Sequence, residues 1–218
     1  MSATFLFCLT LILGAMCSAA PLPAEKGRFR KSDLVELYHT PSGFHLDIRY
    51  AVANNFTGRA VYPEARAFLQ RPAAQALKRV QKSLAKQGYG LIVYDAYRPW
   101  SVTKLFWDMT PDDKKQFVAD PSHGSRHNRG CAVDVSLYDA GTGKPVSMPS
   151  DYDETSERAH VGYAKGSAAA RRHREILRAA MEGEGFTVYA HEWWHFDYKD
   201  HAKYRLADIP FAAILAAK

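Results

Sequence analysis

Residues 125–137 read Ser-Arg-His-Asn-Arg-Gly-Cys-Ala-Val-Asp-Val-Ser-Leu, a stretch that holds both a strand pattern and candidate metal ligands. Its second half alternates between apolar residues and small or polar ones, which is typical of a half-buried β-strand. The alternation predicts that Asp134 points away from the core, beside the small Ala132 on the same face. Gly130 permits the sharp turn that would fold His127 back over the strand. The stretch therefore predicts a metal site on the face of a sheet.

A second stretch, Glu-Trp-Trp-His at residues 192–195, adds a second imidazole and a further carboxylate. It follows another predicted strand at residues 186–189. Glu192 and His195 are three positions apart, so a regular strand would place them on opposite faces. We therefore expect a bend or bulge at this point if both side chains face the metal.

Together the two stretches supply the side chains of a catalytic zinc site. Such a site takes three protein ligands and keeps a fourth position for water, whose pKa the metal lowers toward neutrality. His127, Asp134 and His195 are the predicted ligands, and Glu192 remains as the catalytic base. Each stretch alone has a plainer interpretation, a chance pair of loop residues or an aromatic core segment with a solvated glutamate. Their joint occurrence favours the metal site.

These motifs resemble those of the D-alanyl-D-alanine dipeptidase family. The matching positions are Ser125-x-His127-x-x-Gly130-x-Ala132-x-Asp134 and Glu192-x-Trp194-His195, with further similar segments within residues 50–58, 95–99 and 148–160. The wider superfamily includes D,D-carboxypeptidases, lysostaphin-type peptidases and the zinc fold of hedgehog domains, but the Tyr-Arg-Pro and Glu-Trp-Trp-His-Phe segments favour the dipeptidase branch. The resemblance implies hydrolysis of D-Ala-D-Ala to two D-alanines in peptidoglycan turnover.

The resemblance also implies roles for the residues of the two stretches. One zinc ion per chain would bind His127, Asp134 and His195. Glu192 would take the proton of the attacking water and later deliver one to the leaving amine.

Arg98 is implied by the same resemblance to stabilise the transition state. An arginine keeps its charge and donates hydrogen bonds only, which suits an oxyanion that develops on the peptide carbonyl. The apolar residues 91–97 predict a buried strand that presents this arginine at its end. The plainer interpretation is a surface ion pair, with Asp95 as the partner.

Three further residues are implied to bind the two charged ends of a dipeptide. Asp153 and Tyr50 would hold the amino terminus, and Ser125 would assist at the carboxyl end. The charge run around Asp153 is also typical of a solvated loop. His160 falls in a segment similar to the family but stays outside the predicted ligand set.

The length and composition are those of one folded domain. The chain has 218 residues, of which 47% are hydrophobic, enough to bury a single core. The spacing of apolar residues predicts a helix over residues 73–87, a short capped helix from Thr110 and a helix that begins after Ser167. We also expect an extended pair near residues 35–52. Helices that flank a small, mostly antiparallel sheet make this an α+β domain, expected to span residues 33–218.

The first twenty residues carry no charge and contain an apolar run at residues 5–16, followed by small residues. This pattern predicts a signal peptide over residues 1–20 and a linker over residues 21–32. The apolar run is too short to span a membrane. Cys17 permits a lipid-anchored alternative, but Met16 before it is bulkier than lipidation sites usually accept. We therefore expect a periplasmic or secreted protein.

The net charge is +6, but the basic residues are scattered and no recognised nucleic-acid motif is present, so we expect no nucleic-acid partner. The expected partner is D-Ala-D-Ala or a related small D-amino-acid peptide. The sequence leaves the oligomeric state open.

Two other functions stay open. The connection between Pro99 and Ser125 is short beside that of better-known dipeptidases, in which this segment helps to enclose the active site. A shorter segment would leave the site more open and would admit longer peptides. This favours, as one alternative, a D,D-carboxypeptidase that acts on longer stem peptides. The other is a zinc-stabilised binding module without turnover, although a purely structural metal needs neither Glu192 nor Arg98.

Overall fold

The predicted metal-site strand is the central strand of a five-stranded sheet. It forms β5 (Ala132–Asp139) in the computed structural model, which describes residues 21–40 and 43–214. The sheet has the order β2-β4-β5-β7-β6, and its other strands are β2 (His45–Leu46), β4 (Tyr89–Asp95), β6 (Phe186–Tyr189) and β7 (Glu192–Tyr198). β2 runs parallel to β4, whereas the other neighbours are antiparallel. The expected α+β fold with a small, mostly antiparallel sheet is confirmed.

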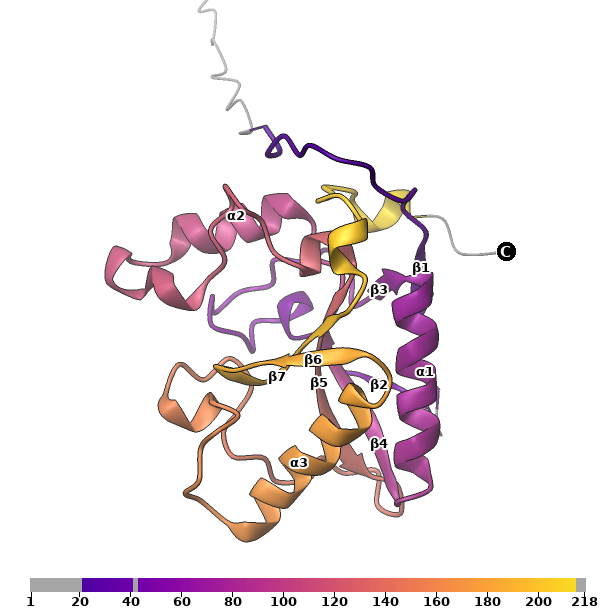
Figure 1. Ribbon diagram of the computed structural model, residues 1–218. Helices are drawn as coiled ribbons and strands as arrows, with labels where there is room; N and C mark the ends of the chain where they lie inside the picture. The colour runs from indigo at the N-terminus through magenta and orange to yellow at the C-terminus, as the bar shows by residue number, and fades with distance from the viewer. Residues whose placement is uncertain (1–20, 41–42, 215–218) are drawn as a thin grey trace, which may run out of the picture.

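Helices α1 (Arg71–Ala85) and α3 (Ala168–Glu182) contact each other and pack on the sheet (Figure 1). Each helix buries an apolar stripe, and removing that stripe from water holds an amphipathic helix on a sheet. Both helices were predicted, although α1 lies about two residues nearer the N-terminus, with a proline in its first turn. Ser167 caps α3 as predicted, because its Oγ accepts the N–H of Ala170 at 3.1 Å.

A second, two-stranded sheet joins β1 (Leu34–Leu37) to β3 (Ala67–Gln70) in antiparallel orientation. The extended pair expected within residues 35–52 is therefore wrong, since β1 pairs with β3 and β2 pairs with β4. Pro41 and Ser42, which fall within this expected pair, lie outside the described residues. β3 continues directly into α1, so its pairing brings β1 beside that helix. A partner strand this far along the chain leaves no local signal in the sequence of β1.

The connection after β4 contains a helix that was not predicted. α2 (Trp100–Met109) is rich in β-branched and aromatic residues of weak helix propensity, but it buries Phe106 and gains tertiary packing. The helix expected from Thr110 is the 3-10 helix η2 (Asp112–Phe117), and Thr110 does not cap it. Its hydroxyl donates instead to the Phe106 carbonyl oxygen at 2.7 Å and closes α2. The other 3-10 helices of the described chain are η1 (Arg49–Ala51), η3 (His127–Arg129), η4 (Glu157–Ala159), η5 (His201–Lys203) and η6 (Phe211–Ala213).

The second face of the sheet is covered as well. Ile92, Tyr94 and Tyr138 form a cluster on it, packed against Tyr152, and β5 is buried on both faces up to its last residue. The expectation of a half-buried strand is therefore wrong, because β5 is central and the loop that carries Tyr152 packs over it. Asp134 is only 3% exposed as a result. A carboxylate at this depth requires positively charged or hydrogen-bonding partners.

The segment before β1 packs against the C-terminal part of the chain. Glu25 accepts hydrogen bonds from Arg129 Nη2 at 2.6 Å and from Leu206 N at 2.7 Å. The predicted linker over residues 21–32 thus contacts the folded domain at this position. The predicted signal peptide over residues 1–20 lies outside the described residues.

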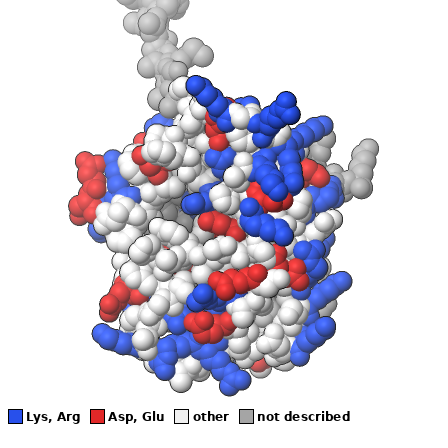
Figure 2. Space-filling view, viewed as in Figure 1, with Lys and Arg blue, Asp and Glu red and all other residues white. Residues whose placement is uncertain are grey.

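Charged side chains of both signs share the face shown in Figure 2, where Lys and Arg gather mainly toward the margin and Asp and Glu lie among them. This mixture differs from the continuous basic stripe of nucleic-acid-binding proteins. Within residues 21–40 and 43–214, no helix has both the length and the apolar character needed to cross a membrane.

Candidate metal centre and active-site cleft

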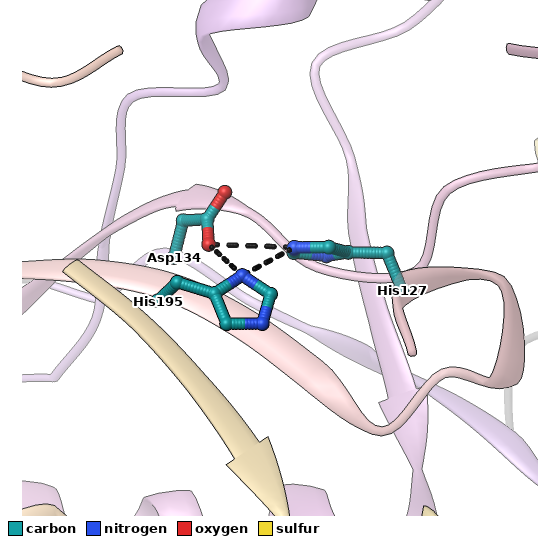
Figure 3. Close-up of side chains that lie close together, drawn as sticks. All are labelled: His127, Asp134 and His195. Carbon is teal, nitrogen blue, oxygen red and sulfur yellow. Dashed lines mark hydrogen bonds and ion pairs between the residues drawn. The ribbon is translucent and has the colours of Figure 1, made fainter. Parts of the chain in front are cut away.

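The three predicted metal ligands converge at one point on the sheet (Figure 3). Asp134 on β5 and His195 on β7 are opposite each other in the strand register, and η3 brings His127 to the same place. His127 Nε2 lies 3.1 Å from His195 Nδ1 and 3.3 Å from Asp134 Oδ1, and His195 Nδ1 lies 3.1 Å from that same oxygen. Atoms spaced in this way can all bind one ion at bond lengths of about 2.0–2.2 Å.

In each imidazole one nitrogen, the inner one, points at the other two ligands. The outer nitrogen points away from them and faces a hydrogen-bond acceptor, which fixes the tautomer. His127 Nδ1 lies 2.6 Å from the carbonyl oxygen of Ala96, and since a carbonyl only accepts, Nδ1 carries the proton. His195 Nε2 lies 3.0 Å from Asp197 Oδ1, which places the proton on Nε2 in the same way. Both inner nitrogens and the Asp134 oxygen therefore direct lone pairs at one place. Two imidazoles and a carboxylate are a donor set that suits zinc or a related divalent ion.

The charges around this point favour a bound cation. Burial alone would raise the pKa of Asp134, but the adjacent His127 and His195 hold that pKa well below its usual range. Burial would also lower the pKa of His195, but the carboxylates of Asp134 and Asp197 raise it to about 10. The carboxylates that attract a proton on His195 would attract a metal ion at the same place in the same way. The residues fit a divalent metal by charge as well as by geometry.

Gly130 and Asn128 hold His127 in this position. Gly130 adopts the left-handed backbone conformation with φ of 65°, and a Cβ on it would come within 2.4 Å of a neighbouring leucine side chain. Asn128 is fully buried, and its side-chain amide donates to the Arg98 carbonyl oxygen at 2.9 Å and to Thr103 Oγ1 at 2.8 Å. The glycine was predicted from the sequence. The role of Asn128 was not, because both of its partners lie on another part of the chain.

Glu192 faces the three ligands from the first position of β7. Its Oε2 lies 3.8 Å from His195 Nδ1, and burial raises its pKa. The pairing of β6 with β7 shifts register between Val188 and Tyr189. This irregularity agrees with the expected bend or bulge, and it allows Glu192 and His195 to share one side of the strand.

Arg98 follows β4 and lines the same cleft. Its Nε and Nη2 donate to Asp95 Oδ2 at 3.0 and 2.7 Å, while the Tyr62 hydroxyl donates to the other oxygen of this carboxylate at 2.8 Å. The guanidinium also lies over the rings of Tyr50 and Phe106, with its carbon 5.3 and 4.9 Å from their centroids. The ion pair with Asp95 therefore exists, but it is buried and not on the surface. Arg98 is held rigidly beside the cleft.

Tyr50 and Asp153 meet on the wall of the cleft. The Tyr50 hydroxyl lies 3.1 and 3.2 Å from the two carboxylate oxygens of Asp153. Asp153 has a φ of 62°, a left-handed conformation that is uncommon outside glycine and that the surrounding structure must hold in place. Burial raises the pKa of Asp153 to about 8, and the Asp134 carboxylate acts in the same direction. A cationic group beside Asp153 would favour its ionised form.

Ser125 lies next to the ligand loop, where its Oγ accepts the N–H of His127 at 3.2 Å. All eight predicted site residues line one cleft of about 960 Å³. The structure therefore brings the ligands, the predicted base, the predicted arginine and the three predicted substrate-binding residues to one place.

Polar residues behind the site were missed in the sequence analysis. The Tyr152 hydroxyl donates to Asp134 Oδ2 at 2.9 Å. Asp197 accepts from His195, and Arg126 Nε lies 3.3 Å from Asp197 Oδ2. Asp197 follows His195 by two positions in a strand, so the strand period places the two on one face, and this signal was available. Tyr152 comes from an irregular loop and leaves no such signal.

Comparisons with known proteins identify relatives of the chain. Residues 30–213 match the protein family described as D-ala-D-ala dipeptidase. The chain is 36% identical over 185 residues to the D-alanyl-D-alanine dipeptidase of Escherichia coli, an alignment that covers 85% of this chain and 94% of that protein. It is 36% identical over 200 residues to the D-alanyl-D-alanine dipeptidase of Enterococcus faecalis, covering 82% of this chain and 92% of that protein.

Comparison with solved structures gives a partial match to the structure of the LdcB LD-carboxypeptidase. It has a TM-score of 0.42 and 23% sequence identity, and the match covers 69% of this chain and 71% of that one. The family match, which extends over most of the chain, and the two dipeptidase relatives lead to one assignment. This chain is a peptidase that belongs to the D-alanyl-D-alanine dipeptidase family.

Proposed function

We propose that this peptidase is a zinc-dependent dipeptidase that hydrolyses D-alanyl-D-alanine to two D-alanines, in peptidoglycan turnover outside the cytoplasm. One observation carries the proposal, the convergence of His127, Asp134 and His195 in a cleft with Glu192 beside them. Family membership supports the substrate class, since both relatives are named for this dipeptide.

The ligands would hold zinc through His127 Nε2, Asp134 Oδ1 and His195 Nδ1. When bound, zinc supplies positive charge that polarises a peptide carbonyl and lowers the pKa of water. Glu192 accepts the proton of the attacking water on its carboxylate and delivers it to the leaving amine nitrogen, so that the peptide C–N bond breaks and two free amino acids form. The raised pKa of Glu192 suits a group that holds this proton between the two steps.

Arg98 supplies a fixed positive charge for the carbonyl oxygen, which becomes negative in the transition state. The buried carboxylate of Asp95 accepts two of its N–H groups, and Tyr62 holds that carboxylate in turn. Because these partners fix the guanidinium before substrate arrives, little reorganisation is needed during the reaction.

The two charged ends of a dipeptide would bind to different residues of the cleft wall. A free dipeptide carries an ammonium and a carboxylate group, and charge-assisted hydrogen bonds are the strong ones. Asp153, held by Tyr50, would accept the ammonium group. Ser125, beside the ligand loop, would donate to the carboxylate.

A D,D-carboxypeptidase that acts on longer stem peptides is the second candidate. The cleft of about 960 Å³ lies near the upper end of the range for drug-sized ligands, roughly 300–1,000 Å³, and a dipeptide is smaller than such ligands. Phe56, Met109 and Phe117 on its wall are exposed and would offer apolar contacts to a longer chain.

Release of free D-alanine separates these candidates. Protein loaded with one equivalent of zinc should release D-alanine from D-Ala-D-Ala but not from a stem pentapeptide that ends in D-Ala-D-Ala, as measured with D-amino-acid oxidase. A chelator should stop the release. Release from the pentapeptide would favour the carboxypeptidase, and chelator-insensitive release, or none from either peptide, would contradict a metallopeptidase acting on these substrates.

Replacement of the predicted base tests the mechanism directly. Glu192→Gln keeps the shape of the side chain but cannot take up the proton, so kcat should fall by roughly 10²–10⁴-fold, while the zinc content stays equal to that of the unmodified protein. Glu182→Gln, an exposed change in α3, is the matched control and should retain full activity. Full activity in Glu192→Gln would remove this residue from the role of base.

A further inference from the structure

We propose that His160 and His191 form a second site for a divalent transition metal, at the rim of the active-site cleft. These two residues, the rim pair, line the cleft, but the proposed hydrolysis uses neither of them. His160 directly follows η4, and His191 lies in the turn between β6 and β7. Metal binding by the rim pair goes beyond the proposed function and does not depend on it.

The two imidazoles of the rim pair are spaced as ligands of one ion. His191 Nδ1 lies 3.4 Å from His160 Nε2. Two nitrogens bound to one tetrahedral ion at about 2.0–2.1 Å are about 3.3–3.4 Å apart. The ring planes are inclined at 76° with centroids 4.8 Å apart, close to the 72° and 4.9 Å of His127 and His195. The rim pair therefore repeats the mutual arrangement of the two imidazoles in the metal centre.

Backbone hydrogen bonds hold the two loops of the rim pair together. The N–H of Val161 donates to the carbonyl oxygen of Ala190 at 3.0 Å, and each of these residues is the direct neighbour of one histidine. The backbone of His160 is fixed further, since its N–H donates to Glu157 O and its carbonyl accepts from Tyr163 N, both at 3.1 Å. A metal would therefore find the two ligands already in place, and less conformational entropy is lost on binding.

The chemistry of the rim pair suits zinc, copper or nickel, for which imidazole is a common ligand. Among the described residues, no third His, Cys, Asp or Glu completes a ligand group there. Water or a ligand from solution would therefore fill the remaining positions, and the affinity should be lower than at the three-ligand centre. A hydrogen bond between the two imidazoles would give the same separation, and metal binding distinguishes the two arrangements.

An ion bound by the rim pair would affect how substrate and product occupy the cleft. The ring of Tyr189 contacts one histidine of each pair, with its centroid 5.4 Å from that of His191 and 5.9 Å from that of His195. Carboxylates are good ligands for the open positions of such an ion, so it would retain the carboxylate of a peptide or of product alanine at the rim. Excess zinc should therefore slow turnover, an effect that rests on the proposed function.

Equilibrium dialysis of the purified protein against zinc, followed by metal analysis, tests the site. The unmodified protein should bind two equivalents, and His191→Asn or His160→Asn should bind one, because each removes one imidazole without burying a charge. His173→Asn is the matched control and should still bind two, since its ring packs on Tyr89 and not on another histidine. A single equivalent in the unmodified protein would overturn the proposal. Two equivalents in both rim variants, or loss of one in the control, would also overturn it.

Activity measurements test the effect on the cleft. At one equivalent of zinc, His191→Asn should hydrolyse D-Ala-D-Ala at the unmodified rate, and excess zinc should slow the unmodified protein several-fold more than the variant. Equal slowing of both would show that inhibition arises elsewhere and would overturn the inhibitory role. If neither protein hydrolyses the dipeptide, the proposed function fails, while the dialysis result still decides whether the rim pair binds metal.

Discussion

In the buried pair, His127 and His195, the facing nitrogens lie 3.1 Å apart and the ring planes are inclined at 72°, while in the rim pair, His160 and His191, the values are 3.4 Å and 76°. The surroundings differ much more than the geometry. The buried pair has a carboxylate, Asp134, in position to be a third ligand, and both of its outer nitrogens face an acceptor. The rim pair is partly exposed, and no carboxylate of the described residues completes its ligand set.

The difference indicates what makes a strong metal site in this fold. Two imidazoles at the correct spacing supply only part of the affinity. The third ligand adds charge, and the acceptors behind each ring fix the tautomer and the ring orientation. The contributions of these parts can be ranked by removing them one at a time from the buried pair, in a His191→Asn background so that the rim pair does not contribute.

The largest loss of zinc affinity is expected from Asp134→Asn. This change would leave the buried pair with two imidazoles and no carboxylate, as in the rim pair. The amide is neutral and a poor ligand, so zinc affinity should fall by more than the roughly 100-fold that marks the upper end for outer-shell changes. Competition with a chromophoric chelator measures the affinity. Asp139→Asn at the far end of β5 is the matched control and should leave it unchanged. An affinity unaltered by Asp134→Asn would exclude this carboxylate as a ligand.

A smaller loss is expected from Asp197→Asn. The carboxylate accepts from His195 Nε2 at 3.0 Å and thereby keeps the lone pair on Nδ1. Without that charge the imidazole is less basic and less firmly oriented, so zinc affinity should fall by roughly 10–100-fold. NMR of the imidazole nitrogens would report the tautomer independently of activity. Asp200→Asn, three residues further along the chain and paired with Lys203, should have no effect. Equal behaviour of the two variants would contradict the role of Asp197.

The smallest loss is expected from Arg126→Gln. Arg126 pairs with Asp197 at 3.3 Å, but about half of its side chain is exposed, at 52%. Exposed ion pairs contribute about 1 kcal/mol or less, so zinc affinity should change by less than about fivefold in the same chelator competition. A loss as large as that of Asp197→Asn would show that this arginine, and not the carboxylate alone, orients His195.

The convergence of His127, Asp134 and His195 could be predicted because each lies in a short motif on a strand or directly before one. His127 and Asp134 are linked by one turn and one strand, and the bulge before His195 follows from the strand period itself. The contacts that support these ligands come from distant segments. Asp95 was considered as a partner of Arg98, but only the fold shows that the pair is buried and held by Tyr62.

The parts of the fold that the sequence did not predict also depend on contacts between distant segments. α1 and α3 carry a clear apolar period and were predicted, as was β5, although its second face was expected to be open. α2 has few strong helix formers and depends on tertiary packing, so local propensity misses it. The pairing of β1 with β3 depends on segments far apart in the sequence, which no local pattern encodes.

The contacts of Glu25 also bear on the order in which the protein folds. Glu25 precedes Arg129 by 104 residues and Leu206 by 181. Contacts between segments so far apart form slowly, because the entropy of closing a long loop opposes them. Arg129 ends η3, the same short helix that begins with the ligand His127. Glu25 therefore adds its contacts to the metal loop only after the first and last parts of the domain have met, so these contacts belong to a late step of folding.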